Sequence, residues 1–350
     1  VNDSLVYSRG MQADIQPFAE GPLLAGWNVR LALEVPDGLS PDGQSRAEET
    51  APLEVRSRIS LAAGERFVRI HSEVTNQARD HRLRVLFPTG MKTGTSFAEE
   101  QFGVIERPSS RSEMKTWEED GWVEAPLAIY QQQTFVDVSD GSRGLAILNR
   151  DLTEYEVLEE EEDTLAVTLF RGVGAMGRPN LVVRPGRASG LAVPTPEGNL
   201  LRTLHFEYAV YPHAGGFSSV GAQAAKLTSP FHVVQTNRHE GTREGSAVLS
   251  KLHPDGLIPS CLKAAEWRNG YVFRFYNATQ DVISDGLLIC SPEFSDVYLV
   301  DLKEDFLDDK GLERDAGRFR LPPVKPSQFM TLLMLPEKQF FRELWICMSI

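Results

Sequence analysis

The amino-acid sequence predicts an all-β protein made of two sandwich-like units. Apolar and polar residues alternate in short runs, as they do in strands with one buried face, and residues 165–170 and 204–210 show this most clearly. The predicted strands recur about every 10–15 residues and are separated by Gly, Asn and Asp turns, a spacing that is typical of sandwiches. No segment keeps a helical period, and the best short-helix candidates are residues 99–102 and 221–227.

A change of pattern divides the chain into two expected domains. Residues 212–237 are rich in Gly, Ser and Ala and interrupt the alternation. We therefore expect a large β-sandwich over residues 1–225 and a smaller one over residues 226–350. The predicted strands are 53–61, 67–74, 83–87, 134–138, 144–148, 155–158, 165–170 and 204–210 in the first domain, and 232–234, 247–249, 271–276, 286–290, 297–302, 319–321 and 329–335 in the second.

Composition excludes several classes of function. The chain has 350 residues, with 49 acidic and 36 basic side chains and a formal net charge of -13. An acidic surface disfavours binding to nucleic acids and to anionic membranes, and no apolar run approaches the ~20 residues of a membrane span. The three cysteines, Cys261, Cys290 and Cys347, are far apart and form no CxxC pair. We expect reduced structural thiols in a cytoplasmic protein.

The most informative segment runs from residue 165 to residue 213. Two predicted strands enclose a connection of more than 30 residues that is rich in Gly and Pro. Loops of this length inside a compact β unit are usually functional. This one also carries four arginines in an acidic chain, at Arg171, Arg178, Arg184 and Arg187.

Motifs in this segment and in three other places carry a resemblance to a known family. They are Leu169-Phe170-Arg171, Gly177-Arg178-Pro179, Arg184-Pro185-Gly186, Thr195-Pro196-Glu197, His205-Phe206-Glu207-Tyr208 and Tyr211-Pro212-His213, then Arg82 to Gly90, Gly144 to Asn149 with Glu154-Tyr155-Glu156, and Leu262 to Glu266 with Arg274 to Asn277. In order and spacing, over roughly three quarters of its length, the chain resembles the C-terminal β region of glycoside hydrolase family 38, the α-mannosidases. Within the family it is most similar to the bacterial branch that includes mannosylglycerate hydrolases.

The resemblance implies a fold and a division of labour. It implies that the large domain is the two-sheet supersandwich shared with aldose mutarotases, followed by the smaller sandwich. In the family, the catalytic α/β domain holds the zinc ion and the nucleophile and precedes this region, and no part of this sequence resembles it. We therefore expect a C-terminal piece of a longer enzyme, inactive alone, with no catalytic residue, metal ligand or cofactor of its own. Its expected partners are its own upstream catalytic domain, an α-mannoside in the complete enzyme, and a second copy of the chain in a homo-oligomer.

Arginine provides the first candidate site residues. Its planar guanidinium can form forked contacts with carboxylates and sugar hydroxyls. Arg171 directly follows a predicted strand, so its position should be fixed. The resemblance implies that an arginine at this strand end helps to frame the sugar-binding cleft. Arg178 is a second candidate for the cleft, with pairing to the acidic surface or to the absent domain as the alternative.

Aromatic residues provide the second set of candidates. Trp117 and Trp122 occur in a polar stretch, residues 109–126, and do not need to be part of a core. We expect them to contact the absent domain, and a stacking platform for sugar is the alternative.

Two alternatives to the fragment interpretation remain open. One is a carbohydrate-binding sandwich without enzymatic activity. The other is a mutarotase-type epimerase, in which His205 and Glu207, on one face of the same predicted strand, would act as base and acid. A protein-held metal is not expected, since no His pair has the HExxH spacing and no Cys lies at zinc-finger distance. The apolar tail, residues 340–350, fits no family motif.

Overall fold

The computed structural model describes residues 5–336 except residues 44, 230, 239, 242–247 and 293. The predicted all-β class is confirmed, because antiparallel sheets dominate the described chain. The chain forms two compact units. Unit 1 contains Val1–Ala98 and Glu106–Gly216, and unit 2 contains Glu99–Ile105 and Phe217–Ile350. Where the chain separates into independently folding domains stays a prediction.

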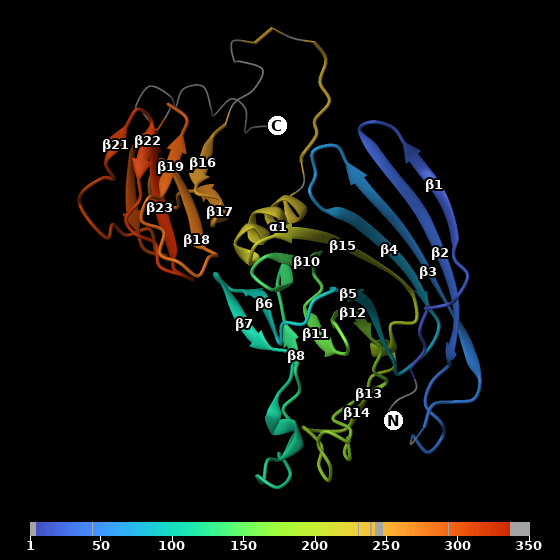
Figure 1. The fold of residues 1–350 in the computed structure, drawn as a ribbon. Coiled ribbons are helices and arrows are strands. Elements are labelled where there is room, and N and C mark those ends of the chain that lie inside the picture. Colours follow the sequence, from blue (N-terminus) through green and yellow to red (C-terminus); the bar gives the residue numbers. More distant parts are fainter. Residues whose placement is uncertain are drawn as a thin grey trace. The chain divides into compact units, whose positions relative to one another are not determined.

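Unit 1 is built around a nine-stranded antiparallel sheet (Figure 1). Long strands form one half of the sheet because their apolar residues alternate with polar ones over many positions. In sheet order the strands are β1 (Asp14–Glu20), β2 (Leu24–Pro36), β3 (Thr50–Ala62), β4 (Val68–Asn76), β15 (Thr203–Ala214), β10 (Arg143–Arg150), β9 (Phe135–Ser139), β6 (Thr95–Glu100) and β7 (Gly103–Pro108).

A second sheet of four strands packs against the first. Its order is β5 (Arg82–Pro88), β12 (Asp163–Arg171), β11 (Glu154–Glu159) and β8 (Ile129–Gln131). Buried side chains from both sheets meet in one hydrophobic core, with Val74 and Ile147 from the large sheet and Tyr155 and Val167 from the small one. Two sheets that enclose a common core form a sandwich.

Strand β12 is the most deeply buried element near the candidate site. The eight residues Asp163–Phe170 are all buried, and the next residue, Arg171, is exposed. Each fully buried Leu, Val or Phe of such a strand contributes about 1.5–3 kcal/mol relative to its exposed state. Arg171 therefore leaves the sandwich from a strand that is held on both sides by β5 and β11.

Unit 2 contains a smaller pair of sheets. The helix α1 (Val220–Thr228) precedes them. One sheet has the order β16 (Ser250–His253), β19 (Leu287–Cys290), β22 (Arg318–Arg320) and β21 (Arg314–Asp315), and the other has the order β17 (Leu257–Ala264), β18 (Tyr271–Asn277), β23 (Phe329–Pro336) and β20 (Phe294–Val300). Leu288 and Phe319 from the first sheet share a core with Phe275, Val297 and Leu332 from the second. The smaller unit is therefore a sandwich too.

Unit 2 also contains the tip of the β6–β7 hairpin. The ring of Phe102 lies 6.1 Å from the ring of Tyr276 and 4.9 Å from that of Phe329. The hydroxyl of Tyr276 donates a hydrogen bond to the carboxylate of Glu99, which is buried. Unit 2 is therefore assembled from two segments that are more than 100 residues apart in the sequence.

Three local predictions have clear outcomes. The helix predicted at residues 221–227 is confirmed as α1. The helix predicted at residues 99–102 is wrong, because this stretch ends β6 and turns into β7, with Phe102 at a φ of 60°. The strand predicted at residues 232–234 is also wrong: Val233 and Val234 are 89% and 81% exposed and pair with no strand among the described residues. The tail at residues 340–350 lies outside the described residues, as does Cys347.

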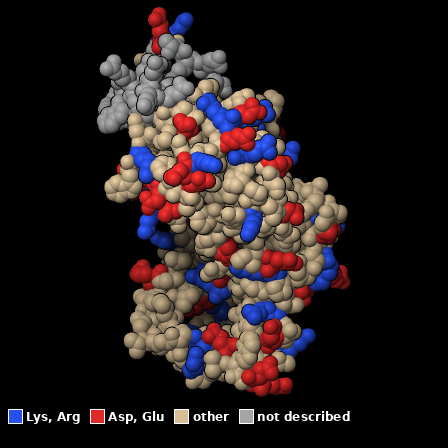
Figure 2. Space-filling model, turned by 90° about the vertical axis from the view of Figure 1, so that its left-hand side faces the viewer, with Lys and Arg blue, Asp and Glu red and all other residues tan. Residues whose placement is uncertain are grey.

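Charge is spread over the surface and does not form one large patch on the visible side. On the face shown in Figure 2, acidic and basic side chains are interspersed. In the described part of the chain no helix is long and apolar enough to cross a membrane.

Candidate functional site

The end of β12 presents an arginine that is anchored at one nitrogen. The Nε atom of Arg171 donates a hydrogen bond of 3.0 Å to Oε1 of Glu154 on the neighbouring strand β11. The hydroxyl of Thr168 donates to the same carboxylate at 2.6 Å. The Arg171 side chain remains 47% exposed, and neither of its terminal nitrogens has a hydrogen-bond partner among the described residues. The Nε atom of Arg171 is therefore held in place, while its two terminal nitrogens can still donate hydrogen bonds.

More charged residues surround this arginine. Arg82 on β5 lies 3.5 Å from Glu154 and 3.6 Å from Glu156, and Arg84 donates to Glu156 at 2.6 Å. We call these three arginines and two glutamates the arginine–glutamate cluster. Burial alone would raise the pKa of Glu154, but the Thr168 hydroxyl and the Arg171 guanidinium outweigh it and lower that pKa. Glu154 is therefore ionised and fully engaged, which suits an anchor and not a general acid.

Backbone hydrogen bonds fix the start of the connection between β12 and β15, residues 172–202, which we call the connector. The amide of Gly172 donates to the carbonyl of His81 at 2.7 Å, and the amide of Gly174 donates to Oδ1 of Asp80 at 2.8 Å. Asn199, which is buried near the other end of the connector, accepts from the Asp80 amide at 2.9 Å. Both ends of the connector are therefore attached to the same turn before β5.

The middle of the connector meets the tryptophan-bearing segment, residues 109–128, which we call the tryptophan loop. The amide of Ala125 donates to the carbonyl of Val183 at 2.8 Å. The guanidinium of Arg184 is buried between the two segments, 4.0 Å from Glu124 and 3.5 Å from the carbonyl of Arg178. Arg178 itself is exposed, and in the described chain its guanidinium has no hydrogen-bond partner.

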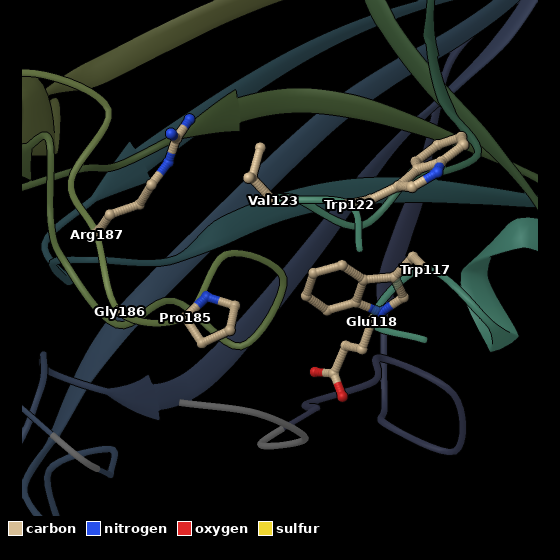
Figure 3. A pocket seen from close by; sticks show the side chains of 7 residues that line it. All are labelled: Trp117, Glu118, Trp122, Val123, Pro185, Gly186 and Arg187. Carbon is tan, nitrogen blue, oxygen red and sulfur yellow. The ribbon is translucent and has the colours of Figure 1, made fainter. Parts of the chain in front are cut away.

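A shallow hollow lies where these two segments meet (Figure 3). It is lined by Trp117, Glu118, Trp122, Val123, Pro185, Gly186 and Arg187. The ring of Trp117 extends toward Pro185, and Arg187 lies beyond Gly186 on the connector side. The structure thus brings together both tryptophans that the sequence singled out and the loop that carries the arginines. It does not bring them into contact with the arginine–glutamate cluster.

His205 and Glu207 lie apart from both places, on β15 of the large sheet. Their side chains share one sheet face, as predicted from their spacing of two residues. Glu207 is held by Arg150 at 3.0 Å and lies 3.7 Å from Arg69. His205 is 57% exposed and lies 3.8 Å from Glu73. The role of His205 and Glu207 in sugar contact stays a prediction.

Sequence reasoning missed a buried polar pair in unit 1. Nε2 of His213 lies 2.7 Å from Oδ1 of Asp137, and both side chains are almost completely buried. The Ser139 hydroxyl donates to the other carboxylate oxygen at 2.7 Å. Serine and histidine both contact the aspartate and not each other, so the histidine cannot activate the serine as a nucleophile. No spacing rule links residues 137 and 213, because strand pairing brings them together.

Among the described residues, no group of three or more His, Cys, Asp or Glu side chains is placed to hold a metal ion. Cys261 and Cys290 are both free thiols, and burial raises the pKa of Cys290 to about 11. A thiol with a raised pKa is a poor nucleophile at neutral pH.

Comparisons with known proteins agree with the motifs. Residues 25–175 match the family model described as the glycosyl hydrolases family 38 C-terminal domain. A putative mannosylglycerate hydrolase of Halalkalibacterium halodurans is 25% identical over 295 residues, which are 83% of this chain and 30% of the relative. Human alpha-mannosidase 2C1 is 24% identical over 280 residues, 79% of this chain and 24% of the relative.

Solved structures extend the similarity to nearly the whole chain. The crystal structure of an alpha-mannosidase from Enterococcus faecalis V583 superposes with a TM-score of 0.79 at 26% identity, covering 94% of this chain and 35% of that one. A glycosyl hydrolase family 38 protein from Enterococcus faecalis has the same fold, with a TM-score of 0.76 at 24% identity. The chain thus spans about a third, or less, of the length of the relatives that it matches.

These matches show that the chain is similar to the C-terminal part of glycoside hydrolases. Within that class, the similarity is to the C-terminal domain of family 38, α-mannosidase-like proteins. The resemblance predicted from the motifs around Arg171 is therefore confirmed.

Proposed function

We propose that this chain is the C-terminal β region of an α-mannosidase-like glycoside hydrolase, and that it supports a catalytic domain and frames one wall of the sugar-binding cleft. In this proposal the zinc ion, the nucleophile and the acid belong to the other domain of the complete cytoplasmic enzyme. Two carboxylates roughly 5–10 Å apart across the scissile bond are required for the reaction. The chain alone is accordingly inactive toward α-mannosides.

The proposal rests on the guanidinium of Arg171, which is held at Nε and has two terminal nitrogens that remain able to donate. A surface arginine with a purely structural role commonly uses its fork in its ion pair, whereas Arg171 binds Glu154 through Nε and leaves both terminal nitrogens without a partner among the described residues. Thr168 and Arg82 contact the same carboxylate oxygen of Glu154 and help to hold it in place. An arginine prepared in this way can contact the hydroxyls of a sugar or a carboxylate that belongs to another domain.

The share of the relatives that this chain covers supports a separate catalytic domain. The similarity extends over 83% of this chain but over 30% of the bacterial relative, so most of that protein lies outside the matched region. Glu154 and Glu207, which both belong to motifs of the family resemblance, are both bound to arginines. Engaged, ionised carboxylates fit a supporting role better than a catalytic one.

The substitution Arg171→Lys in the complete enzyme tests the cleft role. Lysine keeps the charge but cannot reproduce the forked contact, which is typically worth about 1.5–3 kcal/mol. We expect kcat/KM for an aryl α-mannoside to fall roughly 10- to 150-fold, with the melting temperature nearly unchanged.

Arg150→Lys is the matched control. Arg150 is 40% exposed and pairs with Glu207 at 3.0 Å, so it resembles Arg171 in exposure and in its glutamate partner. It should leave kcat/KM within about twofold of the parent enzyme. Unchanged efficiency in Arg171→Lys contradicts the cleft role, and an equal loss of efficiency and stability assigns Arg171 to a structural ion pair.

A further inference from the structure

We propose that the hollow between the tryptophan loop and the connector is a binding subsite for one pyranose ring of an oligosaccharide. The proposal concerns unit 1 alone and does not depend on the role of Arg171. It rests on four features of the hollow: its exposed indoles, its fixed walls, its unpartnered polar groups and its size.

Exposed aromatic surface is the first feature. Trp122 is 45% exposed and Val123 is 59% exposed, and Trp117 is only half-buried. The hollow brings two indoles into one concave site, whereas the cores are filled mainly with residues such as Leu, Val and Phe. An indole ring offers a flat apolar face, which is complementary to the apolar face of a pyranose ring, while the sugar hydroxyls stay available for hydrogen bonds.

Hydrogen bonds fix the tryptophan side of the hollow. The amide of Trp122 donates to the carbonyl of Trp117 at 2.8 Å and closes a six-residue turn, residues 117–122, that carries both indoles. The hydroxyl of Thr116, just before this turn, donates to Asp120 within it at 2.8 Å, and Gly121 adopts a φ of 74° that favours glycine. The two indoles are therefore positioned before any ligand binds.

Hydrogen bonds also fix the connector side. The amide of Gly186 donates to Oδ1 of Asn180 at 3.0 Å, and the amide of Arg184 donates to the carbonyl of Leu181 at 2.9 Å. The buried Arg184 side chain and the Ala125–Val183 hydrogen bond tie this wall to the opposite one. A site with both walls fixed loses little conformational entropy on binding.

Two charged side chains of opposite sign line the hollow without partners. The side chains of Glu118 and Arg187 form no hydrogen bond and no ion pair within the described part of the chain. Figure 3 shows the Glu118 carboxylate beside Trp117, and Arg187 on the far side of Gly186. A carboxylate accepts and a guanidinium donates, so together they suit a ligand that has several hydroxyl groups, each able to do both.

The size of the hollow selects a sugar ring over a protein partner. Seven residues line it, and specific protein interfaces usually involve about 20–30 residues on each side. A site lined by seven residues is too small for a protein interface. We therefore expect it to hold a single sugar ring, either free or at the end of an oligosaccharide. A shallow site that holds one ring should bind weakly, with a Kd of about 1 mM.

Calorimetric titration of the chain with an α-linked mannotriose tests the proposal. We expect a Kd of about 1 mM, and a Trp117→Ala variant should weaken binding at least about tenfold. Arg187→Gln and Glu118→Gln should each weaken it about three- to tenfold by removing hydroxyl partners. Trp267→Ala is the matched control, because Trp267 is 77% exposed in unit 2, and it should leave the Kd unchanged.

Thermal melting of each variant confirms that the fold is retained, and Trp122→Ala replaces Trp117→Ala if the latter does not fold. Absence of binding at about 10 mM mannotriose, or equal binding by the parent chain and both tryptophan variants, overturns the proposal. A third result would also overturn the proposal. If Trp117→Ala destabilises the complete enzyme or prevents its assembly, and the chain binds no saccharide, the hollow is a contact site for a polypeptide partner. None of these results bears on the Arg171 test, so the two proposals fail separately.

Discussion

A single glycine makes room for the buried histidine of unit 1. A β-carbon added at Gly144 would lie 2.4 Å from the ring of His213 and 2.8 Å from the side chain of Ser139, so no larger residue fits there unless the pair moves. The His213 ring is stacked on Tyr211, with 5.3 Å between the ring centres, and bound to Asp137. Gly144 and His213 both belong to motifs noticed in the sequence, but only the pairing of β10 with β15 shows why they occur together.

The His213–Asp137 pair should make the stability of the chain depend on pH. Burial disfavours the charged ring, but the hydrogen bond and the negative charge of Asp137 outweigh burial and raise the pKa of His213 above its ordinary value. A raised folded-state pKa adds stability that is complete below about pH 6.5, the ordinary pKa of histidine, and is lost as the pH rises through the folded-state pKa. Asp137→Asn removes this contribution.

Melting curves of the parent chain and of Asp137→Asn at pH 6 and pH 8 provide the measurement. The parent chain should be more stable than the variant at both values, and the difference in melting temperature should be about 2–4 °C larger at pH 6. A difference that is the same at both pH values, or larger at pH 8, contradicts a raised pKa for His213.

At the scale of elements, alternation in the sequence predicted the central strands well. β12 and β15 match the predicted runs closely, because one face of each carries apolar residues at every second position. The helix predicted at residues 99–102 failed because four residues carry too little periodicity to distinguish a helical turn from a hairpin turn. The strand predicted at residues 232–234 failed because β-branched residues form a strand only where a partner strand is available.

The candidate site shows a similar limit. The sequence predicted that Arg171 would follow a strand and that Trp117 and Trp122 would lie outside the core, because both expectations depend on local pattern. It could not predict that the tryptophan loop would meet residues 183–187 of the connector. Contacts between two long connections depend on the packing of whole sheets, and no local pattern encodes them.

The segment after α1 offers a test of how unit 2 is assembled. Phe231 is 98% exposed, and residues 231–238 form no helix or strand and include Arg238. Exposed backbone without secondary structure is the preferred site of proteolysis, so chymotrypsin should cut first near Phe231 and trypsin near Arg238. Unit 2 also contains residues 99–105, which lie before either cut.

The nicked chain should therefore stay in one piece under native conditions. We expect two β-rich fragments on a denaturing gel and a single peak of unchanged size in gel filtration, because the buried Tyr276–Glu99 hydrogen bond and the packing of Phe102 hold residues 99–105 within unit 2. Fragments that separate in gel filtration, or a first cut inside either sandwich, would contradict this account of unit 2.

At the scale of the whole molecule, we propose that the chain and the rest of the complete enzyme have separate roles. The chain has two complete hydrophobic cores, but within its described residues it has no cluster of metal ligands. Its relatives are glycoside hydrolases about three to four times as long as the region they share with it. In the proposed function, this β region contributes fixed walls and an anchored arginine, and the other part of the complete enzyme contributes the chemistry.

Hydrolysis of an aryl α-mannoside by the purified chain is the most direct test of that claim. The assay is run with and without added zinc, beside the complete enzyme, and metal content is measured after dialysis. We predict turnover by the complete enzyme only, no turnover by the chain above the blank, and no stoichiometric zinc in the chain. Zinc-stimulated turnover by the chain alone would contradict the claim that the catalytic machinery lies elsewhere.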